Sequence, residues 1–249
     1  MYNKTTILEC IVGSTLHGTS VSDGLEDLDL MAIVVEEPRH IVGFYQEDTW
    51  TKRSKPEGVR SEAGDTDYVA YGLRKYLHLA LKGNPTILLA MFAPQGFVRV
   101  INDYGQELQS MYQRIVSKQV YAPFRGYMRQ QHERLLGLRG QRNITRPELV
   151  KAHGFDTKYA AHIVRLGLQG EEILSTGRIT LPMPVEQREL ITSIRLGKYS
   201  LGQVSEIIID AENRIVSAYE NSKLPEKPDW KYVQEWMIDT YFTLWKSNT

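Results

Sequence analysis

A short apolar run that ends in Gly-Ser, followed by a second apolar run that opens on alternating aspartates, constrains this chain more than any other feature. The first run covers residues 10–12 and leads into Gly13 and Ser14, and the second covers residues 28–35. Both runs are rich in β-branched residues and are bounded by glycine, serine or aspartate, which is typical of strands. The pattern therefore predicts a strand, a glycine-containing turn, a short helix and a second strand.

Asp27 and Asp29 stand two residues apart at the beginning of the second run. On a strand this spacing points both carboxylates to the same face. Two like charges held close together repel, and a cation between them removes that cost. Because hard cations such as Mg²⁺ prefer carboxylate oxygens and keep positions open for water and phosphate, the pair is a candidate site for Mg²⁺ or Mn²⁺.

Gly13 and Ser14 offer backbone N–H groups and a hydroxyl just before the predicted helix, an arrangement that suits a phosphate. Either motif alone has an ordinary structural explanation, since Gly-Ser is common in turns and short motifs recur by chance. The conjunction of a phosphate cradle with a carboxylate pair outlines a site for phosphoryl transfer.

These residues resemble the signature of DNA polymerase β-type nucleotidyltransferases: Gly13-Ser14, a glycine shortly after, and Asp27-Leu28-Asp29 before an apolar strand. The resemblance implies that the Gly-Ser turn holds a nucleoside triphosphate and that the two aspartates bind Mg²⁺. It also implies a third carboxylate on a neighbouring strand. His17, which stands where an aromatic residue is usual, joins Gly13 and Ser14 among the predicted nucleotide-binding residues.

From about residue 11 to residue 202 the chain is similar to a group of stand-alone predicted nucleotidyltransferases of bacteria and phages. The similarity rests on Asp67 followed by Tyr71-Gly72-Leu73-Arg74-Lys75, on Lys82-Gly83-Asn84-Pro85, and on residues 158–165. Asp65 and Asp67 are both candidates for the third carboxylate. We favour Asp67, which matches the position of the acid in that group, and interpret Asp65 as a turn or capping residue.

Lys158, His162 and Arg165 stand at i, i+4 and i+7, along one stripe of a predicted helix. The residues between them are largely apolar, and such donors on an apolar helix need solvent or an anion. The resemblance implies that this helix faces the catalytic cleft, where Lys158 and Arg165 contact phosphate. We include His162 in the predicted nucleotide-binding set.

Composition limits the class of protein. The chain has 249 residues and one cysteine, which excludes an internal disulfide and favours a cytoplasmic location. It has no apolar run long enough to cross a membrane and no signal-peptide pattern. The net charge is zero, but residues 1–50 carry nine acids and residues 114–151 carry nine bases. This asymmetry suits a polyanionic substrate, or it reflects no more than solvated helix faces.

The remaining pattern predicts an α+β fold: a small mixed β-sheet core over residues 1–102, then a mostly helical domain over 103–249 that contributes to the substrate cleft. We expect a short strand at 41–45, and helices at 71–81, 85–92, 103–117, 121–138, 146–174, 186–195, 201–221 and 230–246. Asn84 is expected to cap the helix at 85–92. Aromatic residues of the last helix are expected in the core or at a homodimer contact: Trp236, Tyr241, Phe242 and Trp245.

The sequence thus predicts a metal-dependent nucleotidyltransferase that moves an NMP from an NTP to a hydroxyl, with Asp27, Asp29 and Asp67 as catalytic and metal-binding residues. An RNA or tRNA 3′ end is the favoured acceptor. Nucleotidylation of a protein or small molecule uses the same site and stays open. A catalytically silent fold that binds RNA or protein is the rival from another class, and a metal-dependent hydrolase is a weaker one.

Overall fold

A computed structural model describes residues 5–21, 28–44, 46–54, 65–137 and 146–247. Its contacts divide the chain into two compact units. Unit 1 contains residues 1–116 and 228–249, and unit 2 contains residues 117–227. The helical segments 103–116 and 230–247, which the sequence alone assigns to the helical domain, thus group with the sheet by contact.

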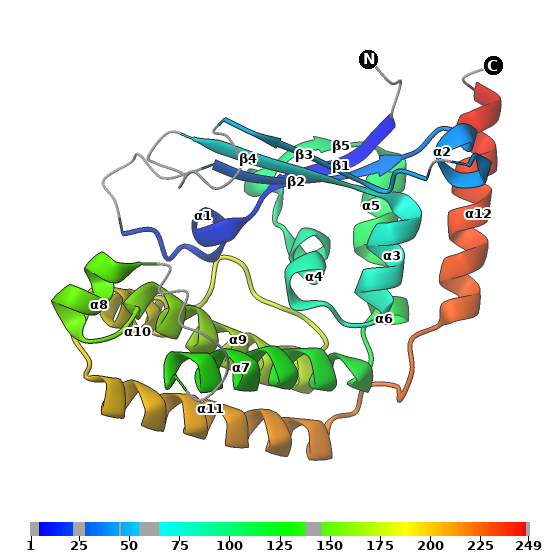
Figure 1. The fold of residues 1–249 in the computed structure, drawn as a ribbon. Helices are drawn as coiled ribbons and strands as arrows, with labels where there is room; N and C mark the ends of the chain where they lie inside the picture. Colours follow the sequence, from blue (N-terminus) through cyan, green and yellow to red (C-terminus); the bar gives the residue numbers. More distant parts are fainter. Residues whose placement is uncertain (1–4, 22–27, 45, 55–64, 138–145, 248–249) are drawn as a thin grey trace. The chain divides into compact units, whose positions relative to one another are not determined.

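Unit 1 is built on a mixed sheet (Figure 1) whose strands, among the described residues, run in the order β3-β4-β2-β1-β5. The strands are β1 (Thr5–Ile11), β2 (Leu28–Val35), β3 (Thr49–Arg53), β4 (Thr66–Gly72) and β5 (Val98–Ile101). β2 and β4 are parallel, whereas the other neighbouring pairs are antiparallel. β3 and β5 are therefore the edges, and β2 lies at the centre.

The central strand is apolar on both faces, which explains its unbroken hydrophobic run. Met31 and Ile33 are buried on one face, and Ala32 and Val34 on the other, where Trp50 and Tyr68 pack over them. Figure 1 shows α3, α4 and α5 together on one face of the sheet. The helices of unit 1 are α1 (Gly13–His17), α2 (Pro38–Val42), α3 (Leu73–Leu81), α4 (Pro85–Phe92), α5 (Asp103–Ser110), α6 (Tyr112–Ile115) and α12 (Trp230–Ser247), with a 3₁₀ turn, η1 (Gln95–Phe97).

The last helix, α12, is fixed to unit 1 through Glu36, a residue just beyond β2 that is 1% exposed. The Glu36 carboxylate accepts hydrogen bonds from the Tyr241 hydroxyl and, at 3.0 Å, from the backbone N–H of Leu73. Trp245 Nε1 donates to the Glu36 carbonyl oxygen at 2.7 Å. Two of the four aromatic residues considered for a homodimer contact thus pack inside their own unit, whereas Phe242 is 55% exposed.

Unit 2 is helical in its described part, and its centre is the long helix α9 (Thr157–Thr176), which contacts α7, α10 and α11. Gly167 and Gly170 allow close packing, because a Cβ at either position would crowd side chains of α7 and α11. The surrounding elements are η2 (Lys118–Val120), α7 (Tyr121–Leu135), α8 (Pro147–His153), α10 (Val185–Arg195) and α11 (Leu201–Asn221).

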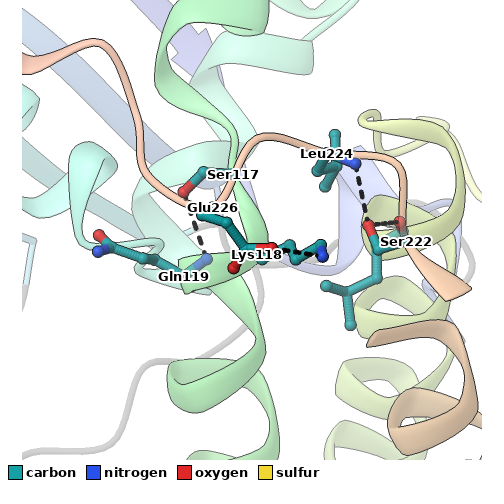
Figure 2. A network of polar contacts seen from close by, with 7 residues as sticks. Ser117, Lys118, Gln119, Ser222, Leu224 and Glu226 are labelled. Atoms are coloured by element: carbon teal, nitrogen blue, oxygen red, sulfur yellow. Dashed lines mark hydrogen bonds and ion pairs between the residues drawn. The ribbon is translucent and has the colours of Figure 1, made fainter. Parts of the chain in front are cut away.

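The two ends of unit 2 are bound to each other (Figure 2). Lys118 Nζ lies 2.6 Å from Glu226 Oε1, and the backbone N–H of Lys118 donates to the carbonyl of Pro225 at 2.9 Å. The Ser222 hydroxyl donates to the carbonyl of Leu174 and accepts from the backbone N–H of Leu224. The chain therefore enters and leaves this unit at one place.

Most predicted elements are present, but several predictions were wrong, and the helix expected at 103–117 is divided into α5 and α6 at residue 111. The single helix expected at 146–174 is two helices, α8 and α9, because Gly154 takes a left-handed conformation and Asp156 caps the second helix by accepting from the N–H of Tyr159 at 2.9 Å. Of the strand expected at 41–45, residues 41 and 42 belong instead to the short helix α2, which starts at a proline, and residue 45 lies outside the described residues. The capping role of Asn84 is confirmed, since its side chain accepts from the N–H groups of Thr86 and Ile87.

Candidate functional site

The strand register brings two of the predicted carboxylates together. Asp29 on β2 is the direct partner of Asp67 on β4 in a parallel ladder. Side chains at paired positions of adjacent strands point to the same face, so these two carboxylates are neighbours. Both residues are only partly buried. Asp27, the other member of the predicted pair, lies outside the described residues.

Gly13 lies directly beside this pair. Its φ of +68° is the left-handed conformation that favours glycine, and a Cβ at this position would collide with the carboxylate of Asp29. The backbone N–H of Val12 also donates to the carbonyl of Asp29 at 2.9 Å. The turn after β1 therefore packs against the start of β2. The predicted site requires this proximity between the Gly-Ser turn and the aspartates.

Ser14 and His17 belong to the short helix α1, which begins at Gly13 and is followed by the capping residue Gly18. Ser14 is partly exposed, and its carbonyl accepts from the N–H of Thr19 at 3.0 Å. The side chain of His17 is buried, with 3% of the residue exposed. A residue so enclosed offers almost no surface to a nucleotide, and we leave His17 out of the contacts proposed below.

Asp65 has a structural explanation. Its side chain accepts a hydrogen bond from the Ser54 hydroxyl at 2.9 Å, and its carbonyl accepts from the N–H of Leu28 at 2.8 Å. The Ser54 hydroxyl in turn accepts from the N–H of Thr66 at 3.0 Å. These bonds join the ends of β2, β3 and β4, which agrees with the interpretation of Asp65 as a turn residue and leaves Asp67 as the favoured carboxylate.

A positively charged residue that was not among the predicted site residues, Arg53, lies beside Asp67. Arg53 on β3 is the register partner of Asp67, and its Nε lies 3.9 Å from Asp67 Oδ1. The polar, basic sequence of residues 48–64 predicts a loop, but residues 49–53 form the strand β3, whose pairing with β4 is a long-range feature. Across the sheet, Arg53, Asp67 and Asp29 therefore form one row.

The second predicted group of site residues lies on α9 in unit 2. Lys158 is exposed, whereas His162 and Arg165 contact each other, with Arg165 Nη2 2.6 Å from His162 Nδ1. Arg165 Nη1 also donates to Gln169 Oε1 at 2.8 Å. Burial, together with the positive charges of Arg165 and Arg146, lowers the pKa of His162 to about 3. His162 is therefore neutral at physiological pH, and its Nδ1 accepts a hydrogen bond from the Arg165 guanidinium.

The described residues suit a divalent cation in the type of donor they supply. Asp29 and Asp67 present carboxylate oxygens from adjacent strands at a partly exposed position, and hard cations bind such oxygens. No group of three histidine, cysteine, aspartate or glutamate side chains that could hold a metal occurs within the described ranges. The third predicted ligand, Asp27, falls in the segment that these ranges omit.

The chain matches one family model over residues 2–239, that of the "RNA repair pathway DNA polymerase beta family". The chain belongs to this family. The match confirms the resemblance to DNA polymerase β-type nucleotidyltransferases that the sequence motifs indicated. The sheet followed by helices confirms the predicted α+β fold class. Membership of this family supports nucleotidyltransferase activity.

Comparison with curated proteins found no match. Among solved structures, the chain is similar to a nucleotidyltransferase-like protein from Exiguobacterium sibiricum 255-15, with 11% sequence identity and a TM-score of 0.32. That similarity covers 87% of this chain and 69% of the other. In the described part of this family member, no helix is both long and apolar enough to cross a membrane.

Proposed function

We propose that this chain transfers a nucleoside monophosphate from an NTP to the hydroxyl at an RNA 3′ end, with release of pyrophosphate and with dependence on Mg²⁺ or Mn²⁺. The observation that carries the proposal is the ladder that pairs Asp29 with Asp67 beside Gly13, in a chain of an RNA repair family. This is the arrangement that the two sequence motifs require if they form one site.

Asp29 and Asp67 would hold the divalent ion together with Asp27. When bound, such an ion supplies charge neutralisation to phosphate oxygens and lowers the pKa of a nearby hydroxyl. Asp67 then accepts the proton of the attacking 3′ hydroxyl. The oxygen–α-phosphorus bond forms as the bond from the α-phosphorus to the bridging oxygen breaks, and pyrophosphate leaves. Ser14 and neighbouring backbone N–H groups bind the leaving phosphates.

In this proposal Lys158 and Arg165 bind phosphate groups of the substrate. Arg165 suits this role because the guanidinium forks around phosphate oxygens, and the neutral imidazole of His162 fixes its orientation. His162 is thus a positioning residue. The exposed Lys158, which lies one turn before His162 on the same helix, offers a point charge.

The acceptor is assigned from the family description rather than from the basic segment at 114–151. Seven of the nine bases there are described by the structure, and among these, ion pairs are formed by Arg114, Lys118, Arg125, Arg129 and Arg146, with Asp229, Glu226, Glu212 and Asp156 as their partners. Much of that positive charge is therefore neutralised by the chain itself, which favours the structural explanation for those residues.

The test is transfer of label from each α-³²P-NTP, with Mg²⁺ or Mn²⁺, to an RNA ending in a 3′ hydroxyl. A matched RNA ending in a 3′-deoxy nucleotide, a total protein extract and a no-acceptor sample run in parallel. We expect label only on the hydroxyl-ended RNA, and none with Asp29→Asn or Asp67→Asn. Asp239→Asn, an exposed aspartate on α12, is the control variant and should retain full activity.

Label on protein instead of RNA would replace the acceptor and keep the reaction. RNA binding without divalent ions, unchanged in Asp29→Asn and without any transfer, would instead identify a silent fold that acts by binding.

A further inference from the structure

Arg53 is held in line with the two carboxylates by the edge strand β3. Three consecutive strands contribute one residue each to the row, Arg53 from β3, Asp67 from β4 and Asp29 from β2, and each pair is a register pair of the sheet. Arg53 and Asp67 contact at 3.9 Å with side-chain exposures of 56% and 28%. The position of the guanidinium is therefore a consequence of strand pairing, although the contact itself is open to solvent.

A contact of this kind is weak and exchangeable. Exposed ion pairs gain little because solvent screens them and both side chains lose freedom when they are held together. A divalent cation that binds the carboxylate of Asp67 places a second positive charge beside the guanidinium, and like charges repel. The same oxygen therefore cannot serve both cations equally well.

An arginine displaced from Asp67 beside a nucleotide site can bind the phosphate oxygens of the nucleotide instead. The guanidinium presents a planar fork of N–H donors that matches two oxygens of a phosphate, whereas a lysine ammonium provides a point charge. Arg53 also lies at the edge of the sheet that the described residues form, and its side chain is 56% exposed.

We propose that Arg53 is an exchangeable counter-ion of the candidate active site: it neutralises Asp67 in the metal-free protein, yields that carboxylate to the divalent cation, and then binds phosphate oxygens of the nucleotide. This inference rests on the proposed function, because it takes Asp67 as a metal ligand. It makes Arg53 a specificity-determining residue for the triphosphate, and it couples metal binding to nucleotide binding through one side chain.

The competing explanation is that Arg53 does no more than protect an edge strand, where charged side chains discourage pairing with another chain. The sheet provides two matched controls for it. Lys52 is the adjacent residue of β3 and pairs with Tyr68, so it points to the opposite face. Arg99 lies exposed on β5, the opposite edge of the same sheet.

The first measurement is calorimetric titration of the full chain with Mn²⁺ in the absence of nucleotide. Removing a competing cation should tighten binding, so Arg53→Met should bind Mn²⁺ about two- to fivefold more tightly than wild type, the effect expected for one exposed ion pair. Arg53→Lys keeps the charge and should stay near wild type. Lys52→Met and Arg99→Met should leave Mn²⁺ binding unchanged.

The second measurement is binding of the α,β-methylene analogues of the four NTPs with Mg²⁺. Arg53→Met and Arg53→Lys should both weaken binding of the preferred analogue, by roughly tenfold for Arg53→Met, because both lose the fork. Thermal unfolding of each variant shows that the fold is retained. Mn²⁺ binding no tighter in Arg53→Met, or analogue binding unchanged in Arg53→Met, overturns the proposal, as does an equal effect of Lys52→Met.

The same titrations separate this proposal from the proposed function. If Asp29→Asn and Asp67→Asn bind Mn²⁺ as wild type does, the metal site itself is wrong and both proposals fail. If the wild type binds Mn²⁺ through these aspartates but transfers no nucleotide to any acceptor, the proposed reaction fails. The values for Arg53→Met then still decide the role of Arg53.

Discussion

The central strand β2 carries a carboxylate near each end, and the two have opposite environments. Asp29, near its start, is partly exposed and lies beside a second carboxylate. Glu36, just after its end, is 1% exposed and accepts hydrogen bonds from Tyr241 and Leu73. A carboxylate that accepts hydrogen bonds from buried donors connects elements of the fold, whereas neighbouring carboxylates at a partly exposed position can bind a cation. The comparison separates a structural acid from a functional one.

The largest expected effect is the loss of nucleotidyl transfer in Asp29→Asn, at the start of β2. Loss of a ligand to a catalytic cation removes several kcal/mol of transition-state stabilisation, so nucleotidyl transfer should fall by about a thousandfold or more. The fold should be retained, because asparagine has the same shape and the side chain is not enclosed. Steady-state transfer rates and circular dichroism measure the two quantities. Activity within tenfold of wild type would remove Asp29 from the catalytic set.

Glu36→Ala, just after the end of β2, should lower the stability of the fold. It leaves the buried N–H of Leu73 and the hydroxyl of Tyr241 without their acceptor, and each such loss costs about 1–3 kcal/mol. We expect the free energy of unfolding to fall by about 3–5 kcal/mol, and by about 1–3 kcal/mol for Tyr241→Phe. Urea denaturation measures both. A Glu36→Ala variant as stable as wild type would show that this carboxylate does not hold α12.

The contrast between these two acids was only half visible in the sequence. Asp29 could be predicted because its signals are local: an apolar β-branched run, an alternating aspartate and a preceding Gly-Ser turn. The helices at 85–92 and 201–221 were predicted with the observed bounds for the same reason. Glu36 gave no such signal, since its partner Tyr241 is 205 residues away and no periodicity connects them.

Long-range pairing also explains why Arg53 was missed. Its importance depends on the register of β3 against β4, and a shift by one residue would place Lys52 beside Asp67 instead. The break between α8 and α9 is a different case. Gly154 and Asp156 are ordinary helix-ending and helix-capping residues, and the apolar periodicity on both sides concealed them.

The pH dependence of stability should sharpen the comparison. Burial raises the pKa of Glu36 above its ordinary value, so the folded state favours the protonated form. The stability that follows is fully present below the unfolded pKa of about 4.3 and is lost as pH rises through the raised folded value. Glu36→Gln, which cannot ionise, should remove this loss, by up to about 1.4 kcal/mol for each pH unit of that window.

Urea denaturation of wild type and Glu36→Gln at intervals between pH 4 and pH 8 tests this linkage. The wild type should lose stability relative to the variant as pH rises. Asp239→Asn, an exposed acid on α12, is a control that should follow the wild type. Parallel profiles for wild type and Glu36→Gln would show that the Glu36 carboxylate ionises equally in the folded and unfolded chain.

The smallest expected effect is at the functional end. Replacing one member of a like-charged pair removes the repulsion that the solvent-exposed Arg53 contact offsets only in part, so we expect Asp29→Asn to gain less than about 1 kcal/mol of stability without divalent ions. The order should reverse when Mn²⁺ is added, because a ligand that binds only the folded state stabilises it in proportion to the logarithm of its concentration. At a hundred times the dissociation constant the wild type should gain about 2.7 kcal/mol, and Asp29→Asn much less. Thermal unfolding with EDTA and with Mn²⁺ gives both values for each protein. If the wild type is more stable than Asp29→Asn in EDTA, Asp29 stabilises the fold in the absence of metal, as Glu36 does, and its role is structural.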